Sequence, residues 1–185
     1  LRTIVQHGMP HFENNYATRG APILSSRVAR DFAARGHLNW AHFARIREIW
    51  KGRLVIKGVL APDDARLACD HGAQGIIVSN HGGRQLDGAV APLRVLASVV
   101  AACPGVPVMM DSGVRRGTDV LKALALGARF VFVGRPFAYA AAVGGERGVA
   151  HAIDLLAQEV SRDMAMLGVN GVDEIDAAVH LLKTR

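Results

Sequence analysis

The alternation of short apolar runs with amphipathic stretches is the feature that most restricts how this 185-residue chain can fold. Four runs of mainly aliphatic and aromatic residues have the pattern of buried β-strands, and helical periodicity follows each of them. Strand–helix units of this length produce a parallel sheet with right-handed crossovers. The sequence therefore predicts an α/β protein with strands at residues 54–58, 76–78, 106–111 and 130–133.

Capping residues and prolines indicate where the helices begin. Asn39 can cap a helix whose apolar residues, from Trp40 to Trp50, recur at three- and four-residue spacing. Pro62 and Pro92 suit the first turns of the next two helices. Further helices are expected at residues 120–126, 136–143 and 146–167, with a short helix beginning near Val172.

Two architectures contain such units: an open, doubly wound sheet and an eight-stranded β/α barrel. The polar residues favour the barrel, because every group that looks functional follows the C-terminal end of a strand, and a barrel gathers these ends in one mouth. An open sheet would bring fewer of them together. The groups are Lys57, the loop 79–84, the loop 111–116 and the pair Gly134–Arg135.

Positive charge is concentrated near the N-terminus. The formal net charge is +6, and residues 1–57 contain 10 Lys or Arg against 3 Asp or Glu. Residues 1–37 show no persistent periodicity and are predicted to be an irregular basic segment. Such a segment suits a solvated loop, or contact with a membrane surface or an anionic partner. Nucleic acid is not expected, because no set of stacking aromatic residues accompanies the charge.

No apolar run approaches the roughly 18 to 20 residues that a membrane span needs. Cys69 and Cys103 match no metal-ligand spacing, and neither do the histidines other than His81, so no metal site is expected. Two isolated cysteines are typical of reduced thiols in a cytosolic-type compartment. We expect a cytoplasmic protein, or one held at the cytoplasmic face of the membrane through residues 1–37.

Two glycine–arginine loops in successive units predict a phosphate site. Gly134 and Arg135 precede a helix start, and Gly113 and Arg115 lie in the loop of the preceding unit. Helix N-termini attract anions, glycines permit close approach, and arginines donate paired hydrogen bonds to phosphate oxygens. The loops after the last two strands of a barrel frequently bind phosphate. Helix capping and surface charge are the alternative explanation.

An imidazole and two cations accompany this site. Lys57 ends an apolar strand, where it either forms a structural salt bridge or faces an electron-rich cofactor. His81 alone would more often be a structural histidine, but the nearby Arg84 can hold a planar carboxylate. A histidine base beside a carboxylate clamp indicates proton abstraction from an acid with a reactive α-position.

Three motifs occur in order: SNHGGRQLD at residues 79–87, DSGVRRG at residues 111–117 and Gly134–Arg135. With the strand end LVIKG at residues 54–58, they resemble the FMN-dependent 2-hydroxy acid dehydrogenase and oxidase family, which includes L-lactate dehydrogenase, glycolate oxidase and mandelate dehydrogenase. The resemblance implies an FMN-binding TIM (β/α)8 barrel. Residues 38–185 would supply its C-terminal half, about four βα units.

The resemblance also implies a role for each residue at the strand ends. His81 would be the catalytic base and would contact the substrate, and Arg84 would bind the substrate carboxylate. Lys57 would lie beside N1 and O2 of the flavin, and Ser79 would contact the flavin ring. The ribityl chain and phosphate would be bound by Asp111, Gly113, Arg115, Gly134 and Arg135.

The implied reaction is the oxidation of an L-2-hydroxy acid to the 2-oxo acid, with lactate the leading substrate. The electron acceptor would be a quinone, a cytochrome or oxygen, and a homo-oligomer, a tetramer in particular, is expected. In bacterial membrane-bound relatives the stretch corresponding to residues 1–37 attaches the enzyme to the membrane surface. Another phosphate-binding barrel enzyme, such as an isomerase, and a non-catalytic half-barrel are the alternatives.

A half-barrel alone would expose two sheet edges and an apolar interior. We therefore expect the full gene product to be about twice as long as this chain. In the family, the missing half would supply the tyrosine near the substrate and the aspartate that orients the histidine, and no residue here can be assigned those roles.

Overall fold

The computed structural model describes residues 2–11, 20–26 and 38–181. Internal contacts divide the chain into two units, Leu1–Asn39 and Trp40–Arg185. The first contains a short helix, α1 (Arg2–His7), and an isolated antiparallel bridge between His11 and Pro22. The prediction of an irregular segment is wrong for α1, because a helix of six residues is too short to show periodicity. Residues 12–19 and 27–37 of that segment lie outside the described residues.

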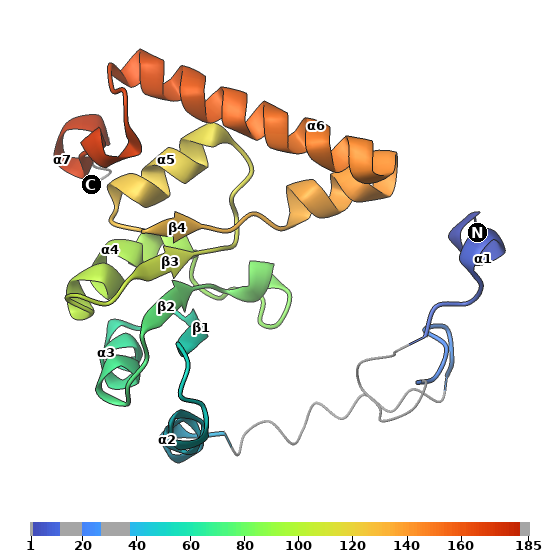
Figure 1. Cartoon of the computed structure of the whole chain (residues 1–185), viewed down its shortest axis with the longest axis horizontal. Helices are drawn as coiled ribbons and strands as arrows, with labels where there is room; N and C mark the ends of the chain where they lie inside the picture. The colour runs from blue at the N-terminus through green and yellow to red at the C-terminus, as the bar shows by residue number, and fades with distance from the viewer. Residues whose placement is uncertain (1, 12–19, 27–37, 182–185) are drawn as a thin grey trace. The chain divides into compact units, whose positions relative to one another are not determined.

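A four-stranded parallel sheet in the order β1-β2-β3-β4 organises the second unit (Figure 1). Its strands follow one another across the sheet in chain order, as in a barrel, whereas a doubly wound sheet reverses its order at a switch point. The predicted parallel sheet is confirmed. The strands are β1 (Val55–Val59), β2 (Gly75–Val78), β3 (Val108–Met110) and β4 (Phe130–Val131).

The last strand is shorter than the predicted run of residues 130–133. Its partner β3 ends at Met110, whose carbonyl accepts a hydrogen bond from Phe132 N at 2.8 Å. Residues 132–134 then lead into the next helix outside the strand. Apolar composition therefore overestimated β4, because a strand extends only as far as its partner.

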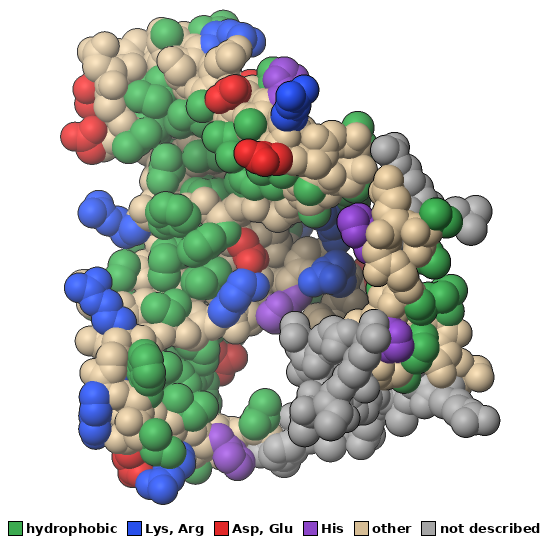
Figure 2. All heavy atoms as spheres, turned by 45° about the vertical axis from the view of Figure 1, so that its right-hand side comes forward, with side chains coloured by type: hydrophobic (Ala, Val, Ile, Leu, Met, Phe, Trp, Pro, Cys, Tyr) green, Lys and Arg blue, Asp and Glu red, His purple; other side chains and the backbone are tan. Residues whose placement is uncertain are grey.

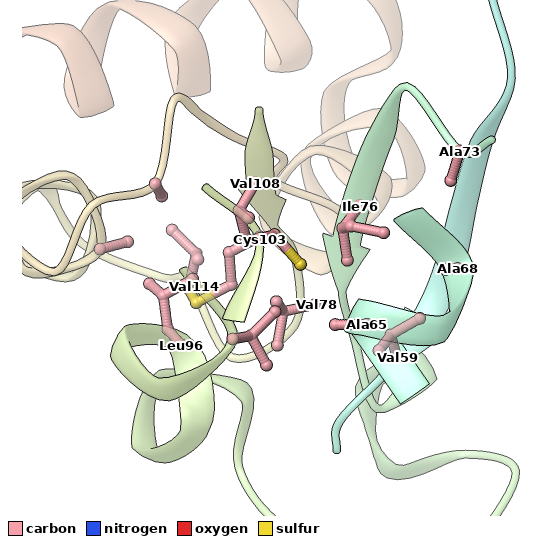
Figure 3. Packing of buried hydrophobic residues seen from close by; sticks show 14 residues of the cluster. Val59, Ala65, Ala68, Ala73, Ile76, Val78, Leu96, Cys103, Val108 and Val114 are labelled. Atoms are coloured by element: carbon pink, nitrogen blue, oxygen red, sulfur yellow. The ribbon is translucent and has the colours of Figure 1, made fainter. Parts of the chain in front are cut away.

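Three helices connect the strands and begin at or close to the predicted positions: α3 (Pro62–Asp70), α4 (Pro92–Ala102) and α5 (Gly117–Ala125). Their apolar faces pack on one face of the sheet, and Figure 3 shows the close-packed cluster that results. Every second residue of β2 and β3 enters it, among them Ile76, Val78, Val108 and Met110. Complete burial of such a side chain stabilises the fold by roughly 1.5–3 kcal/mol, so this core fixes the strand directions.

The other face of the sheet is covered less. Val55 and Phe130 are not part of the core cluster and are 42% and 56% exposed, and Phe132, just after β4, is 40% exposed. The two phenylalanine rings pack on each other with their centroids 4.8 Å apart. Figure 2 shows hydrophobic side chains spread over one side of the molecule.

The first helix of this unit, α2 (Trp40–Ile49), buries only part of its predicted apolar stripe. Trp40 and Phe43 pack against the core, and Trp40 also stacks on His71 with ring centroids 5.6 Å apart. Ile46, Ile49 and Trp50 remain 50%, 68% and 54% exposed. Periodicity located the helix correctly, but burial depends on neighbours that a periodic pattern does not contain.

The helices predicted at residues 136–143 and 146–167 are the two arms of α6 (Arg135–Leu167). Gly145 separates them with φ 56° and ψ −142°, and the chain reverses direction there in Figure 1. The second arm is fastened to α5 by Glu159, which accepts a hydrogen bond from Gly117 N at 2.8 Å and pairs with Arg116 Nη2 at 2.7 Å. These interactions hold the pKa of the Glu159 carboxyl below its usual value.

The short helix predicted near Val172 is present as η4 (Val172–Glu174), which precedes α7 (Ala177–His180). Within the described part of the chain, no helix combines the length and apolar character needed to cross a membrane.

Candidate active site

Lys57 in β1, the loops that follow β2, β3 and β4, and the start of α6 surround a pocket of about 580 Å³. A volume of this size lies within the ordinary range for cofactor and substrate sites. Because the carboxyl ends of parallel strands lie at one edge of the sheet, residues far apart in sequence meet here. Eight of the nine predicted site residues line the pocket: Lys57, His81, Arg84, Asp111, Gly113, Arg115, Gly134 and Arg135.

An ion pair lies at one side of this pocket. Lys57 Nζ is 2.8 Å from Asp111 Oδ2 and donates a hydrogen bond to Ser79 Oγ at 3.1 Å. Lys57 therefore forms a salt bridge, the first of its two predicted alternatives, while also lining the pocket. The pairing keeps an ammonium group at a fixed place beside any bound ligand.

The Asp111 carboxyl is held in its ionised form. Burial raises its pKa, but hydrogen bonds from Lys57, Ser79 and Ser112 and the charge of Lys57 lower it more, so the pKa lies below the ordinary 3.8. Ser112 Oγ donates to Asp111 Oδ1 at 2.8 Å, so the carboxylate has a partner at each oxygen. At neutral pH this group is an anion that orients its neighbours and cannot donate a proton.

Replacing Asp111 by asparagine is expected to lower the free energy of unfolding at pH 7 by about 1–3 kcal/mol, because Lys57 loses its charged partner. The folded-state pKa is lowered, so the carboxylate stabilises the fold fully above the unfolded pKa of about 3.8, and this contribution is lost as the pH falls through the folded value. Urea unfolding of both proteins at pH 7 and under acid conditions should show the difference shrinking. Asp154→Asn, at an exposed position of α6, is the control and should change stability little at either pH.

Ser79 does not line the pocket. It is fully buried, and its Oγ accepts hydrogen bonds from Lys57 Nζ at 3.1 Å and from His81 N at 3.0 Å. The expected contact with a flavin ring is therefore not the role that this position suits. The hydroxyl instead orients Lys57 and the backbone of His81 from below.

The loop after β2 presents an imidazole and a guanidinium to the same pocket. His81 begins the short helix η3 (His81–Gly83) with φ 56°, and Arg84 Nε donates to His81 O at 3.3 Å. Gly58 in β1 makes room for the ring, since a Cβ built at this glycine would lie 2.9 Å from His81 Nε2. The imidazole and the guanidinium that are predicted to act as base and carboxylate clamp thus lie side by side.

The arginines of the same pocket suit a phosphate group. Arg135 opens α6, directly after Gly134, and Arg115 comes from the loop after β3. Arg135 Nη2 donates to Gly82 O at 2.5 Å, which ties this arginine to the histidine loop. The donors that a phosphate needs are provided by the two guanidinium groups and the helix N-terminus. The space is provided by Gly113 and Gly134, because a Cβ added at either position would have no atom within 4 Å.

Other residues line the pocket without having been predicted, notably Ser112, Phe132 and Tyr139. Ser112 lies inside the quoted motif, but its contacts depend on a backbone conformation that the sequence does not reveal. Tyr139 follows Arg135 by one helical turn, so helical periodicity could have placed it on the same side of α6.

A family model described as FMN-dependent dehydrogenase matches residues 4–182. The chain belongs to this family. Its resemblance to the FMN-dependent enzymes is thereby confirmed, and FMN is the cofactor of the family. The glycines, arginines and helix N-terminus of the pocket fit the phosphate of that cofactor.

Curated members of the FMN-dependent dehydrogenase family include an L-lactate dehydrogenase of Caulobacter sp. (strain K31), which is 48% identical over 96% of this chain and 47% of its own length. An L-lactate oxidase of Nostoc sp. is 47% identical over 78% of this chain and 40% of its own length. The chain therefore spans less than half the length of these relatives.

Among solved structures, the monotopic membrane protein (S)-mandelate dehydrogenase is 38% identical, with a TM-score of 0.76 over 86% of this chain and 46% of that protein. The four strands and their helices are thus a partial α/β barrel of the FMN-dependent dehydrogenase type.

Proposed function

We propose that this protein oxidises an L-2-hydroxy acid to the corresponding 2-oxo acid with FMN, and that lactate is the leading substrate. One observation carries the proposal: His81, Arg84 and Lys57 open into the same pocket as the arginines Arg115 and Arg135. With the proposed roles, a base, a carboxylate clamp and a phosphate site would lie within reach of one another. The relatives named for lactate support the choice of substrate.

Each residue of the pocket has a separate role in the proposed reaction. Arg84 binds the substrate carboxylate through paired hydrogen bonds. His81 accepts the proton that leaves the substrate during oxidation. FMN, when bound, supplies the chemistry of electron acceptance by taking the two electrons that the substrate loses. Arg115, Arg135 and the N-terminus of α6 would hold the phosphate of that cofactor.

Lys57 completes this arrangement electrostatically. Its ammonium group is held by Asp111 and Ser79, so it does not have to be reordered when negative charge develops beside it. A fixed positive charge stabilises such an anion more effectively than one that must first be ordered.

Steady-state assays of the full-length protein test the proposal. L-lactate, glycolate and L-mandelate would each be offered with oxygen, a quinone or cytochrome c as acceptor, and D-lactate would serve as the control. We expect a yellow protein that forms the 2-oxo acid from at least one L-2-hydroxy acid. A colourless protein that turns over a phosphorylated sugar without an electron acceptor would support the isomerase alternative instead.

We also propose that the basic segment, residues 1–37, binds an anionic membrane surface. Its surplus of arginines supports this, as does the similarity to a monotopic membrane protein. Flotation with anionic liposomes should recover the protein at low salt and lose it at high salt. Equal recovery with uncharged liposomes, or none with anionic ones, would contradict the proposal. A homo-oligomer, expected as a tetramer, can be measured by light scattering in the same preparations.

A further inference from the structure

Two non-glycine residues in the described part of the chain have positive φ, and both belong to the pocket. They are His81, with φ 56°, and Ser112, with φ 76°. This conformation costs a residue with a Cβ free energy, and it persists only where surrounding interactions enforce it. Ser112 occupies a position that glycine would fill without strain, so its side chain must contribute something that a glycine could not.

The contacts of Ser112 Oγ show what that contribution is. The hydroxyl donates to Asp111 Oδ1 at 2.8 Å and accepts from Gly82 N at 3.0 Å, and it lies 3.5 Å from Ser79 Oγ. It therefore joins the loop after β3 to the loop after β2, across an interval of 30 residues between Gly82 and Ser112.

Gly82 N is the middle one of three successive amides held by side-chain oxygens. His81 N donates to Ser79 Oγ at 3.0 Å, and Gly83 N donates to Asn80 Oδ1 at 3.2 Å. Ser79 and Asn80 belong to the same chain segment as these amides. Ser112 comes from a different βα unit, so it can fix the loop relative to the rest of the pocket, and it holds the amide of Gly82 whereas Arg135 holds the carbonyl of the same residue.

We propose that Ser112 is a positioning residue that holds His81 in its strained backbone conformation and thereby aims the imidazole into the pocket. The strain of Ser112 is tolerated because its hydroxyl bridges Asp111, which is anchored by Lys57, to the amide that follows His81. The ion pair, the serine and the histidine loop then form one rigid unit. This inference rests on the proposed function where it concerns catalysis, but the positioning itself does not depend on it.

Two substitutions separate the hydroxyl from the backbone strain. Ser112→Gly removes both, and Ser112→Ala removes the hydroxyl alone. If Ser112 only shaped the backbone, Ser112→Gly would be at least as stable as the wild type and equally active. If the hydroxyl positions His81, both variants lose about tenfold in kcat, the rate equivalent of one hydrogen bond. KM should rise less than kcat falls, because the exposed Arg84 side chain can still reach the carboxylate.

Hydrogen exchange in the full-length holoenzyme gives a readout that does not require activity. The Gly82 amide should exchange at least tenfold faster in both variants, whereas amides of β2 should keep their protection. Ser98→Ala, at an exposed position of α4, is the matched control and should change neither quantity. If the enzyme proves inactive toward hydroxy acids, faster exchange at Gly82 still supports the positioning role. Wild-type exchange at Gly82 in Ser112→Gly, with or without activity, would overturn it.

Discussion

The substitution His81→Gln is expected to lower kcat by about 10²–10⁴-fold, the usual contribution of a positioned general base. Glutamine can occupy much of the same space and form hydrogen bonds, but it cannot accept the proton. Arg115 and Arg135, the residues proposed to bind the phosphate, are unchanged in this variant, so FMN should bind as in the wild type. Flavin content and kcat, measured on the same preparation, separate the two effects.

His151→Gln is the matched control for this prediction. His151 lies at an exposed position of the long arm of α6 and does not line the pocket. Its replacement should leave both kcat and flavin content unchanged. A His81→Gln enzyme that retains wild-type kcat would show that another group takes the proton.

The substitution Gly58→Ala, in β1, should displace the imidazole ring of His81 and so lower kcat. Its Cβ would lie 2.9 Å from His81 Nε2, closer than carbon and nitrogen atoms can approach without one of them moving. The φ of +100° adds strain for any residue with a side chain. Displacing a catalytic group by as little as 1 Å can cost about 100-fold in rate, so we expect a loss of about that size in kcat.

Gly105→Ala distinguishes misplacement of the ring from backbone strain. Gly105 has φ +78° and no atom within 4 Å of the position where its Cβ would stand. The control should therefore lose about 1–3 kcal/mol of stability and keep its kcat. Equal rate losses in the two variants would attribute the effect of Gly58→Ala to general destabilisation rather than to His81.

Much of the site could be predicted because functional residues of a β/α barrel lie at the C-terminal ends of its strands. Parallel strands bring their carboxyl ends to one edge, so locating the strands was enough to bring Lys57, His81 and Arg135 together. The position of a strand end does not determine which way the next side chain points. Ser79 directly follows β2 and turns into the protein, which is why its predicted contact with a ligand does not match the structure.

The conformational features of the site could not be predicted from residue types. Ser112 and His81 adopt positive φ, which sequence patterns assign to glycine. Gly58 matters through a contact with a ring 23 positions away, and that contact depends on the register of β1 against β2. Both features arise from tertiary packing, which local periodicity does not encode.

The sequence pattern did not predict which apolar side chains are buried. The amphipathic stripe at residues 40–50 and the apolar run at residues 130–133 predicted buried residues, yet Ile49 and Phe130 are 68% and 56% exposed. A periodic pattern indicates which face of an element is suited to burial, but coverage requires a neighbouring element. The described residues cover one face of the sheet with helices and leave the other partly open.

Anaerobic mixing of the full-length, FMN-loaded protein with L-lactate tests the central claim most directly. It measures electron transfer from the substrate to the flavin without any added acceptor. We expect the visible absorbance of the flavin to bleach in the wild type, to remain with D-lactate, and to bleach about 10²–10⁴-fold more slowly in His81→Gln. Glycolate and L-mandelate would be mixed with the protein in parallel, because they replace the methyl group of lactate by a hydrogen atom and by a phenyl group. A protein that binds FMN and is reduced by none of these three 2-hydroxy acids, or whose reduction is equally fast without His81, would contradict the account.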